Sequence, residues 1–258
     1  MDSNDTFFLS IGAHTTRLWK SEAQVLFSHV APTPKTVSAL KCNKDTTTGA
    51  RTEGLCRFLL SLWRVHLFHL AGRVLLLVDP DDHPQFGRLC LRVLAALGLS
   101  QFPRALAVTA TPFPLFAARL HGTSGATVVV DLGHICTRVV PIAHGIILSN
   151  SIAYCAGLGT VPFPGTSFEE LFRRFSTNQP LDLPEDHTKT ELVPSALDYL
   201  FALEESLHEV SAWCRQNYLA SCVGVVTVCG GGSDIPGLRH LIYAIVQKCE
   251  TFGRVYWS

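Results

Sequence analysis

Apolar and polar positions alternate along this chain in two periods, one typical of short strands and the other of helices with one apolar face. Runs rich in β-branched residues form two hairpin patterns, each around a glycine-containing turn. The paired runs are 7–11 with 15–19, and 126–130 with 136–142. Single strands are predicted at 74–78, 105–108, 223–229 and 254–257. The order strand, glycine turn, helix near the end of the chain indicates an α/β fold.

The other apolar residues recur at spacings of three and four, which places them on one face of a helix. The predicted helices are 52–66, 84–99, 112–121, 167–175, 195–214 and 236–249. Ser195 and Asp198 have the spacing of a capping box. No periodic pattern fits 32–51, which contains two prolines, or the polar stretch 178–190, so both are predicted to be loops.

The composition is that of a folded chain with little charge. Of 258 residues, 47% are apolar and 16% charged, which excludes a disordered chain. The 21 basic and 21 acidic residues cancel, so no charge excess favours nucleic acid or an anionic membrane surface. Arginines interrupt the apolar run 55–78, so no membrane span is expected. A composition this apolar favours a protein whose surface is partly buried against other subunits of a larger assembly.

The cysteines and the first residues indicate the compartment. Nine cysteines, an odd number without a CxxC pair, lie mostly inside apolar runs and are predicted to be reduced core residues. The acidic start, residues 1–5, lacks the basic flank of a secretory signal. We therefore expect a cytoplasmic location.

Two turns could carry chemistry. Asp131 and Gly133 follow a buried strand, where a carboxylate could hold a hydrated cation, but this element by itself favours an ordinary hairpin turn with an Asp in its usual role. Gly230, Gly231 and Gly232 join a strand to a helix, where the missing side chains would admit a ligand or a close backbone contact. No lysine follows as in a P-loop, and the position near the end of the sequence does not suit a dinucleotide fingerprint.

These turns together resemble the nucleotide site of actins. Residues 129–133 with 140–145 resemble the second phosphate-loop hairpin, and 229–238 resemble the adenosine-side turn with the Pro-Gly that opens its helix. Segments 76–80 and 107–118 match in order and character. The chain thus resembles a divergent, shortened actin-related protein of the actin, Hsp70 and sugar kinase superfamily.

The resemblance implies an α/β, two-lobed fold in which ribonuclease-H-like mixed sheets clasp ATP and a divalent cation. Residues 1–121 would form the first lobe, with its peripheral subdomain mostly lost in the short stretch 32–51. Residues 122–258 would form the second lobe, with 157–195 replacing most of its peripheral subdomain and the C-terminal return to the first lobe missing. Filaments like those of actin are therefore not expected.

Several positions depart from the family pattern. Ser10 stands where the family has its metal-facing Asp, and His14 stands where the first loop has its second glycine. His134 and Ile135 replace an Asp and a Gly of the second loop. Thr109 or Ala110 stands where the family has the Gln that positions the attacking water.

Because hydrolysis needs the metal charge and a positioned water, we predict no meaningful ATPase activity, no catalytic residue and no metal ligand. If the chain retains any ATP or ADP with Mg, the binding residues would be Gly12, Asp131, Gly133, Gly230, Gly231 and Gly232.

Other polar clusters have a structural explanation beside a functional one. His66 and His69 have helical spacing and could form a metal pair, but a half-buried stripe without a third ligand explains them. The acidic turn of Asp79, Asp81, Asp82 and His83 could bind a cation or could simply be solvated. Neither Ser10 nor Ser233 lies in a nucleophile elbow, so a hydrolase triad is not expected.

The function expected from the resemblance is a catalytically inactive structural subunit or scaffold in a larger cytoskeletal or motor-associated assembly. Its partners would be other protein subunits, including actin or actin-related proteins, in the cytoplasm and on the cytoskeleton. One alternative is a nuclear subunit of a chromatin-remodelling complex. Another is an active ATPase or phosphotransferase, which would need Asp2 or Asp5 in place of Ser10. A third is a fragment or splice form that does not fold alone.

Overall fold

The computed structural model describes most of the chain, and every structural statement below concerns the residues it describes. These are 6–21, 26–42, 49–62, 64–65, 73–80, 82, 84–101, 107–120, 125–158, 196–217, 223–234, 238–249 and 252–257. The chain divides into two compact units, Met1–Phe116 and Ala117–Ser258. The division falls slightly before the boundary expected at 121, and each unit is described by itself.

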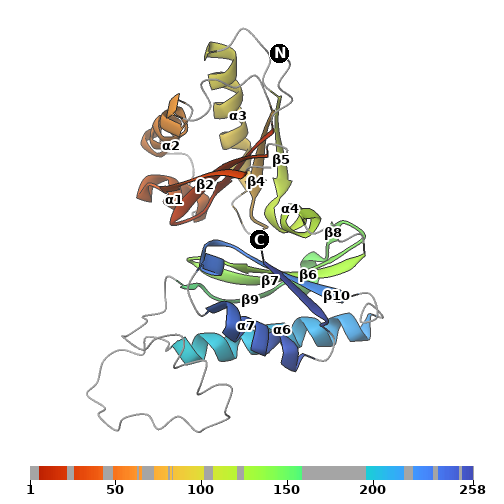
Figure 1. Ribbon diagram of the computed structural model, residues 1–258. Coiled ribbons are helices and arrows are strands. Elements are labelled where there is room, and N and C mark those ends of the chain that lie inside the picture. The colour runs from red at the N-terminus through yellow and green to blue at the C-terminus, as the bar shows by residue number, and fades with distance from the viewer. Residues whose placement is uncertain are drawn as a thin grey trace, which may run out of the picture. The chain divides into compact units, whose positions relative to one another are not determined.

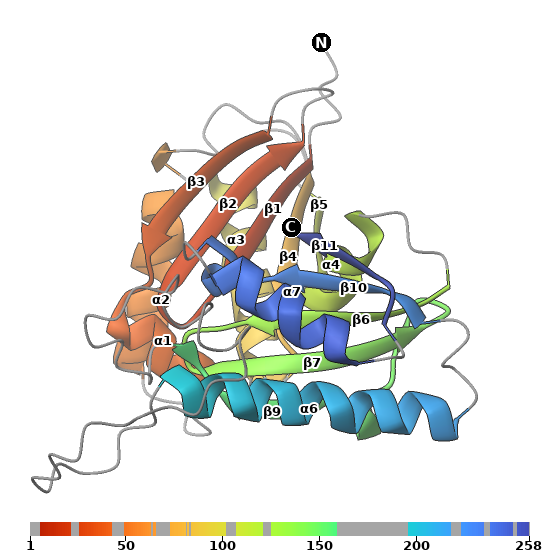
Figure 2. The same ribbon diagram turned by 60° about the horizontal axis from the view of Figure 1, so that its bottom comes forward.

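The first unit is built on a five-stranded mixed sheet with the order β3-β2-β1-β4-β5 (Figure 2). The three strands that begin the unit are antiparallel, whereas β4 and β5 continue the sheet in parallel from β1. The strands are β1 (Thr6–Ile11), β2 (Thr15–Ser21), β3 (Leu26–Pro32), β4 (Arg73–Val78) and β5 (Ala107–Pro112).

Helices cover both faces of this sheet. One face packs against α1 (Lys35–Cys42), α2 (Gly49–Leu62) and α3 (Pro84–Gln101), which bury an apolar core with alternate residues of β1 and β4 (Figure 1). On the other face, α4 (Phe113–Leu120) places the ring of Phe116 4.7 Å from that of Phe8 and 6.0 Å from that of Trp19. Alternate side chains of β1 therefore pack against helices on opposite faces of the sheet, as expected for a strand inside an α/β sheet.

The expectation that 32–51 is a loop is wrong. It contains the whole of α1 and the start of α2, and Val37 and Leu40 are fully buried. Its two prolines precede the helix, and the carbonyl of Pro34 accepts the first turn's hydrogen bonds from Val37 and Ser38 at 2.9 Å each. Proline at a helix start does not break the helix, so Pro32 and Pro34 are compatible with α1. The edge strand β3 was not predicted either.

The second unit repeats the plan of an antiparallel hairpin continued by parallel strands. Its sheet has the order β11-β10-β6-β7-β8, and β9 also pairs with β7. β10 lies parallel to both β6 and β11, while β7 is antiparallel to its neighbours. The strands are β6 (Ala126–Leu132), β7 (Cys136–Ala143), β8 (Ile146–Ile147), β9 (Ala153–Ala156), β10 (Val223–Cys229) and β11 (Arg254–Trp257).

Two helices, α6 (Ala196–Gln216) and α7 (Leu238–Lys248), lie along one face of this sheet (Figure 1). Their apolar stripes pack against Val128, Val130, Val226 and Val228 in one core cluster. The short turns η2 (Ser149–Ser151) and η4 (Gly231–Asp234) complete the unit. Every residue of β6 is buried, which explains why this strand is a continuous β-branched run.

The strands predicted at 223–229 and 254–257 are confirmed to the residue, and the second hairpin is confirmed with slightly longer strands. The predicted helix 167–175, the loop 178–190 and the cap at Ser195 lie outside the described residues. Among the described residues, no helix has the length and apolar character needed to cross a membrane.

Candidate functional site

The first hairpin turns at Gly12, which its own backbone requires to be glycine. The amide of Gly12 donates to the carbonyl of Thr15 at 2.9 Å, and a Cβ on Gly12 would lie 2.6 Å from that oxygen. Ser10 is half-buried in β1 opposite Arg17, and His14 is exposed in the turn. The first hairpin therefore has a hydroxyl where the family pattern has a carboxylate.

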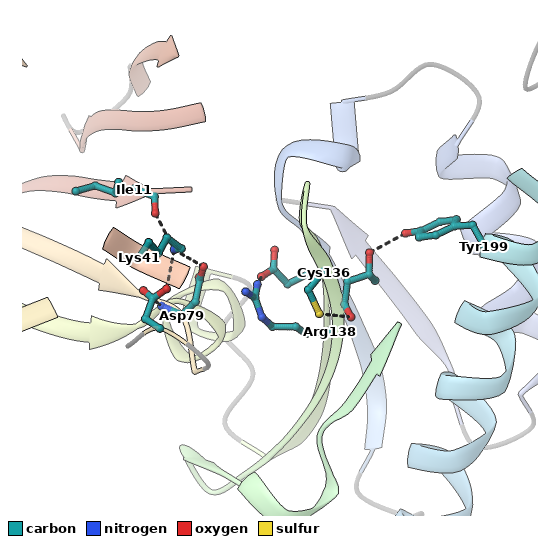
Figure 3. Close-up of polar contacts among 9 residues, drawn as sticks. Ile11, Lys41, Asp79, Cys136, Arg138 and Tyr199 are labelled. Carbon is teal, nitrogen blue, oxygen red and sulfur yellow. Dashed lines mark hydrogen bonds and ion pairs between the residues drawn. The ribbon is translucent and has the colours of Figure 1, made fainter. Parts of the chain in front are cut away.

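A buried lysine from α1 lies at the end of β1. The Nζ of Lys41 donates to the carbonyl of Ile11 at 2.7 Å and to Asp79 Oδ2 at 2.6 Å, and lies 3.0 Å from Asp82 Oδ1 (Figure 3). The side chains of Lys41, Asp79 and Asp82 are only 6%, 12% and 8% exposed. An ammonium has three N–H donors, and here three acceptors surround it. In this arrangement Lys41 has no donor left for a ligand.

The charges of this cluster do not balance, because one ammonium faces two carboxylates. Burial alone would lower the pKa of Lys41, but Asp79 and Asp82 outweigh burial and hold it above its ordinary value. Burial raises the pKa of Asp82 to about 6, although Lys41 acts to lower it. The lysine is therefore firmly charged, and Asp82 accepts a proton more readily than an ordinary aspartate.

The acidic turn is not simply solvated. Asp79 and Asp82 are 12% and 8% exposed and pair with a lysine. Lys41 escaped sequence analysis because it lies in the stretch taken for a loop. The spacing of Val37, Leu40 and Lys41 behind Pro34 is the signal that could have found it. Asp81 and His83 lie outside the described residues.

The second hairpin has its carboxylate, but an arginine holds it. Asp131 is the second-last residue of β6 and lies directly opposite Arg138 of β7, whose Nη1 donates to Asp131 Oδ2 at 2.6 Å (Figure 3). Both side chains are buried, with 8% of Arg138 and 6% of Asp131 exposed. A Cβ placed on Gly133 would lie 3.7 Å from the same Nη1, so the guanidinium lies close to the turn.

The turn of this hairpin is also covered from one side. The amide of Gly157 donates to the carbonyl of Ile135, and that of Leu158 donates to the carbonyl of Gly133, each at 3.0 Å. A Cβ on Gly157 would lie 2.1 Å from the backbone carbon of Ile135, so only glycine fits here. The Ile135 side chain is 48% exposed, and His134 is exposed beside it. Sequence analysis did not single out Gly157.

The glycine turn packs directly on Asp131. Gly230 has a φ of +92°, and a Cβ there would lie 2.5 Å from Asp131 Oδ1 and 2.7 Å from the amide nitrogen of Leu132. A Cβ on Gly232 would lie 2.0 Å from Leu158 Cδ1, while Gly231 is exposed. The structure thus brings Asp131, Gly133, Gly230 and Gly232 together where β6 and β10 end side by side. Packing alone is enough to require Gly230.

The remaining candidates add no catalytic group. Thr109 and Ala110 are exposed in β5 and offer no side-chain amide to a water. His66 and His69 lie outside the described residues. Within the described part of the chain, no three His, Cys, Asp or Glu side chains gather as metal ligands. Burial raises the pKa of Cys155 and Cys249 to about 11, so these thiols are protonated at neutral pH and poor nucleophiles.

Comparison with known proteins places the fold. No family model and no curated protein matches the sequence. Among solved structures, the ethanolamine utilization protein EutJ from Carboxydothermus hydrogenoformans is similar over 100% of this chain and 85% of its own, with a TM-score of 0.52 and 15% identity. Identity this low shows the fold alone. The chain therefore has an α/β fold of the actin/Hsp70-like class, built from two units with mixed sheets. Its narrower assignment to the actin-related proteins stays a prediction.

Proposed function

We propose that this chain is a catalytically silent protein of the actin/Hsp70-like fold, acting as a structural subunit or scaffold of a larger cytoskeletal or motor-associated assembly in the cytoplasm. The observation that carries this proposal is the buried pair of Asp131 with Arg138 at 2.6 Å. It involves the carboxylate that the resemblance assigns to the nucleotide site.

A divalent cation is poorly suited to this site. The cation would have to displace a guanidinium from a buried carboxylate, and breaking such a pair costs about 3–5 kcal/mol. That cost corresponds to a loss of roughly two to four orders of magnitude in cation affinity. Ser10 provides no second carboxylate, and the donors of Lys41 are directed to protein acceptors. Metal-assisted phosphoryl transfer therefore lacks its central charge.

The surface of the second unit supports a role in protein contacts. Ile146 of β8 and Tyr154 of β9 are 65% and 50% exposed, and both strands lie on the same edge of the sheet. Phe201 of α6 and Tyr243 of α7 are also more than half exposed. Exposed aromatic side chains and open strand edges are features that protein partners recognise.

A thermal-shift titration of the purified chain with MgATP and MgADP tests the proposal. A ligand at about one hundred times its dissociation constant stabilises its protein by about 2.7 kcal/mol, so binding is readily detected. We expect no shift that requires both nucleotide and metal. A metal-dependent upward shift would favour the active ATPase or phosphotransferase instead.

A second measurement tests the scaffold role. The tagged endogenous chain should migrate in gradients with an assembly that contains actin or actin-related subunits. Migration as a free monomer would contradict a structural subunit, and co-migration with nuclear remodelling subunits would favour the chromatin alternative.

A further inference from the structure

We infer that Arg138 is a built-in counter-ion of the second hairpin, which neutralises Asp131 in the place of a bound divalent cation. The inference rests on the proposed function and gives it a mechanism. The hairpin would keep its geometry without any ligand because its own side chain supplies the positive charge.

Register makes this pairing unavoidable once the hairpin forms. The turn at Gly133 pairs Leu132 with Thr137, and the next pair outward is Asp131 with Arg138. Residues directly opposite each other in an antiparallel pair point to the same face of the sheet, with Cβ atoms about 5 Å apart. The carboxylate and the guanidinium therefore meet on one face of two neighbouring strands.

The guanidinium occupies the space that a ligand of Asp131 would need. Its Nη1 lies 2.6 Å from Asp131 Oδ2 and would lie 3.7 Å from a Cβ placed on Gly133. The backbone of Gly230 packs against the other oxygen, Oδ1. Asp131 is thus enclosed by the arginine on one side and by the glycine turn on the other. A cation bound to Oδ2 would therefore compete with the guanidinium.

In the first unit, too, a buried basic side chain lies at the end of a central strand, β1. A buried lysine, Lys41, reaches the last carbonyl of β1 and the carboxylates of Asp79 and Asp82. In both units a buried basic side chain of the chain itself therefore lies at the end of a central strand and pairs with a carboxylate. Burial of both partners distinguishes these pairs from a surface salt bridge, which contributes little.

The test is whether removal of the arginine creates a cation site. Arg138→Met keeps much of the aliphatic stem and leaves the carboxylate without its partner. We expect this variant to melt earlier than the wild type in metal-free buffer and to recover part of the loss in millimolar MnCl2. Loss of the free Mn²⁺ signal in electron paramagnetic resonance should give an affinity at least roughly tenfold higher than that of the wild type.

Two controls separate this role from simple packing. The double variant Asp131→Asn/Arg138→Met has no carboxylate and should show no Mn²⁺ response. Arg57→Met removes an exposed pair with Glu53 and should behave as the wild type with Mn²⁺. If Arg138→Met does not fold without metal, its refolding yield is compared in MnCl2 and in choline chloride of equal ionic strength, and a manganese-dependent yield supports the inference.

Three results would overturn the inference. They are an Arg138→Met variant without a Mn²⁺ response, a refolding yield of that variant that is the same in MnCl2 and in choline chloride, and a wild type that binds Mn²⁺ as tightly as the variant. These outcomes are distinct from failure of the proposed function. A wild type that binds MgATP contradicts the proposed function, whereas a silent wild type with an unresponsive Arg138→Met contradicts only the counter-ion.

Discussion

The buried cluster around Lys41 allows a quantitative prediction. Lys41→Met keeps the length and apolar stem of the side chain but removes the ammonium and its contacts with Ile11, Asp79 and Asp82. Two carboxylates, 12% and 8% exposed, then face each other without a cation. The expected effect is therefore the cost of buried, uncompensated charge rather than the loss of one contact.

Removing one partner of a buried ion pair typically costs about 3–5 kcal/mol. The hydrogen bond to the Ile11 carbonyl is lost as well, and each unsatisfied buried group costs about 1–3 kcal/mol. We expect the free energy of unfolding of the first unit to fall by about 3–5 kcal/mol near neutral pH. The two costs do not add in full, because one of the carboxylates can take up a proton and so avoid a buried, unpaired charge. For a unit of this size the melting temperature would fall by on the order of 10–20 °C.

The pH dependence follows from the direction of the Asp82 shift. Burial raises the pKa of Asp82 in the folded chain to about 6, from an ordinary value of 3.8. Its contribution to stability is thus fully present below about 3.8 and is lost as the pH rises through about 6. Without Lys41 the carboxylates gain protons at still higher pH. The difference between wild type and Lys41→Met should therefore be largest above about pH 7 and shrink on acidification.

Hydrogen exchange of peptides from β1, α1 and β4, measured at several pH values, reports this loss within the first unit. The matched control is Arg57→Met, since the Arg57–Glu53 pair also has a 2.6 Å contact but is 78% and 62% exposed. Such a surface pair contributes only about 0.3–0.5 kcal/mol. The reasoning is refuted if Lys41→Met costs no more than this control, or if its cost grows as the pH falls.

Two further predictions concern the second unit. Gly230→Ala places a side chain at a φ of +92° and against the backbone of Leu132. It should lower the free energy of unfolding, measured by chemical denaturation, by more than about 2 kcal/mol. The control Gly224→Ala, whose Cβ would have nothing within 4 Å, should change it little. Equal stability of the two variants would contradict the packing at the glycine turn. Thr227→Val should stabilise by about 1 kcal/mol, because Thr227 Oγ1 is buried with no hydrogen-bond partner among the described residues. Thr137→Val should destabilise by about as much, because Thr137 Oγ1 shares a 2.9 Å hydrogen bond with Tyr199, and the same sign for both threonines would refute this argument.

The elements that sequence predicts well are those in which one local pattern decides the outcome. β6 and β10 are rich in β-branched residues, β6 is buried throughout and β10 over residues 226–229, and such runs have few alternatives to a central strand. α7 shows its apolar stripe at Leu238, Leu241, Ile242 and Ile245, all buried. By contrast, α1 is short, follows two prolines and depends on the core for its stability, so its local signal is weak.

The candidate site was predictable only in its backbone. The sequence predicts turns at Gly12, Gly133 and Gly230. The structure places each of them in a turn where a Cβ would clash with backbone atoms or with the Asp131 carboxylate. The basic residues were not predictable in the same way. The pairing of Arg138 with Asp131 depends on the register of the hairpin, and Lys41 is far in sequence from Asp79 and Asp82.

The sequence by itself determined the alternation of strands and helices, the two hairpins, and hence the class of fold, because hydrophobic period and turn glycines act over a few neighbouring residues. Only the tertiary structure decided that Asp131 is held by Arg138 and that Asp79 and Asp82 share Lys41. Those pairings arise from strand register and from a helix docking on a sheet. The state of a charge depends on what surrounds it, and burial and partners exist only once the chain has folded.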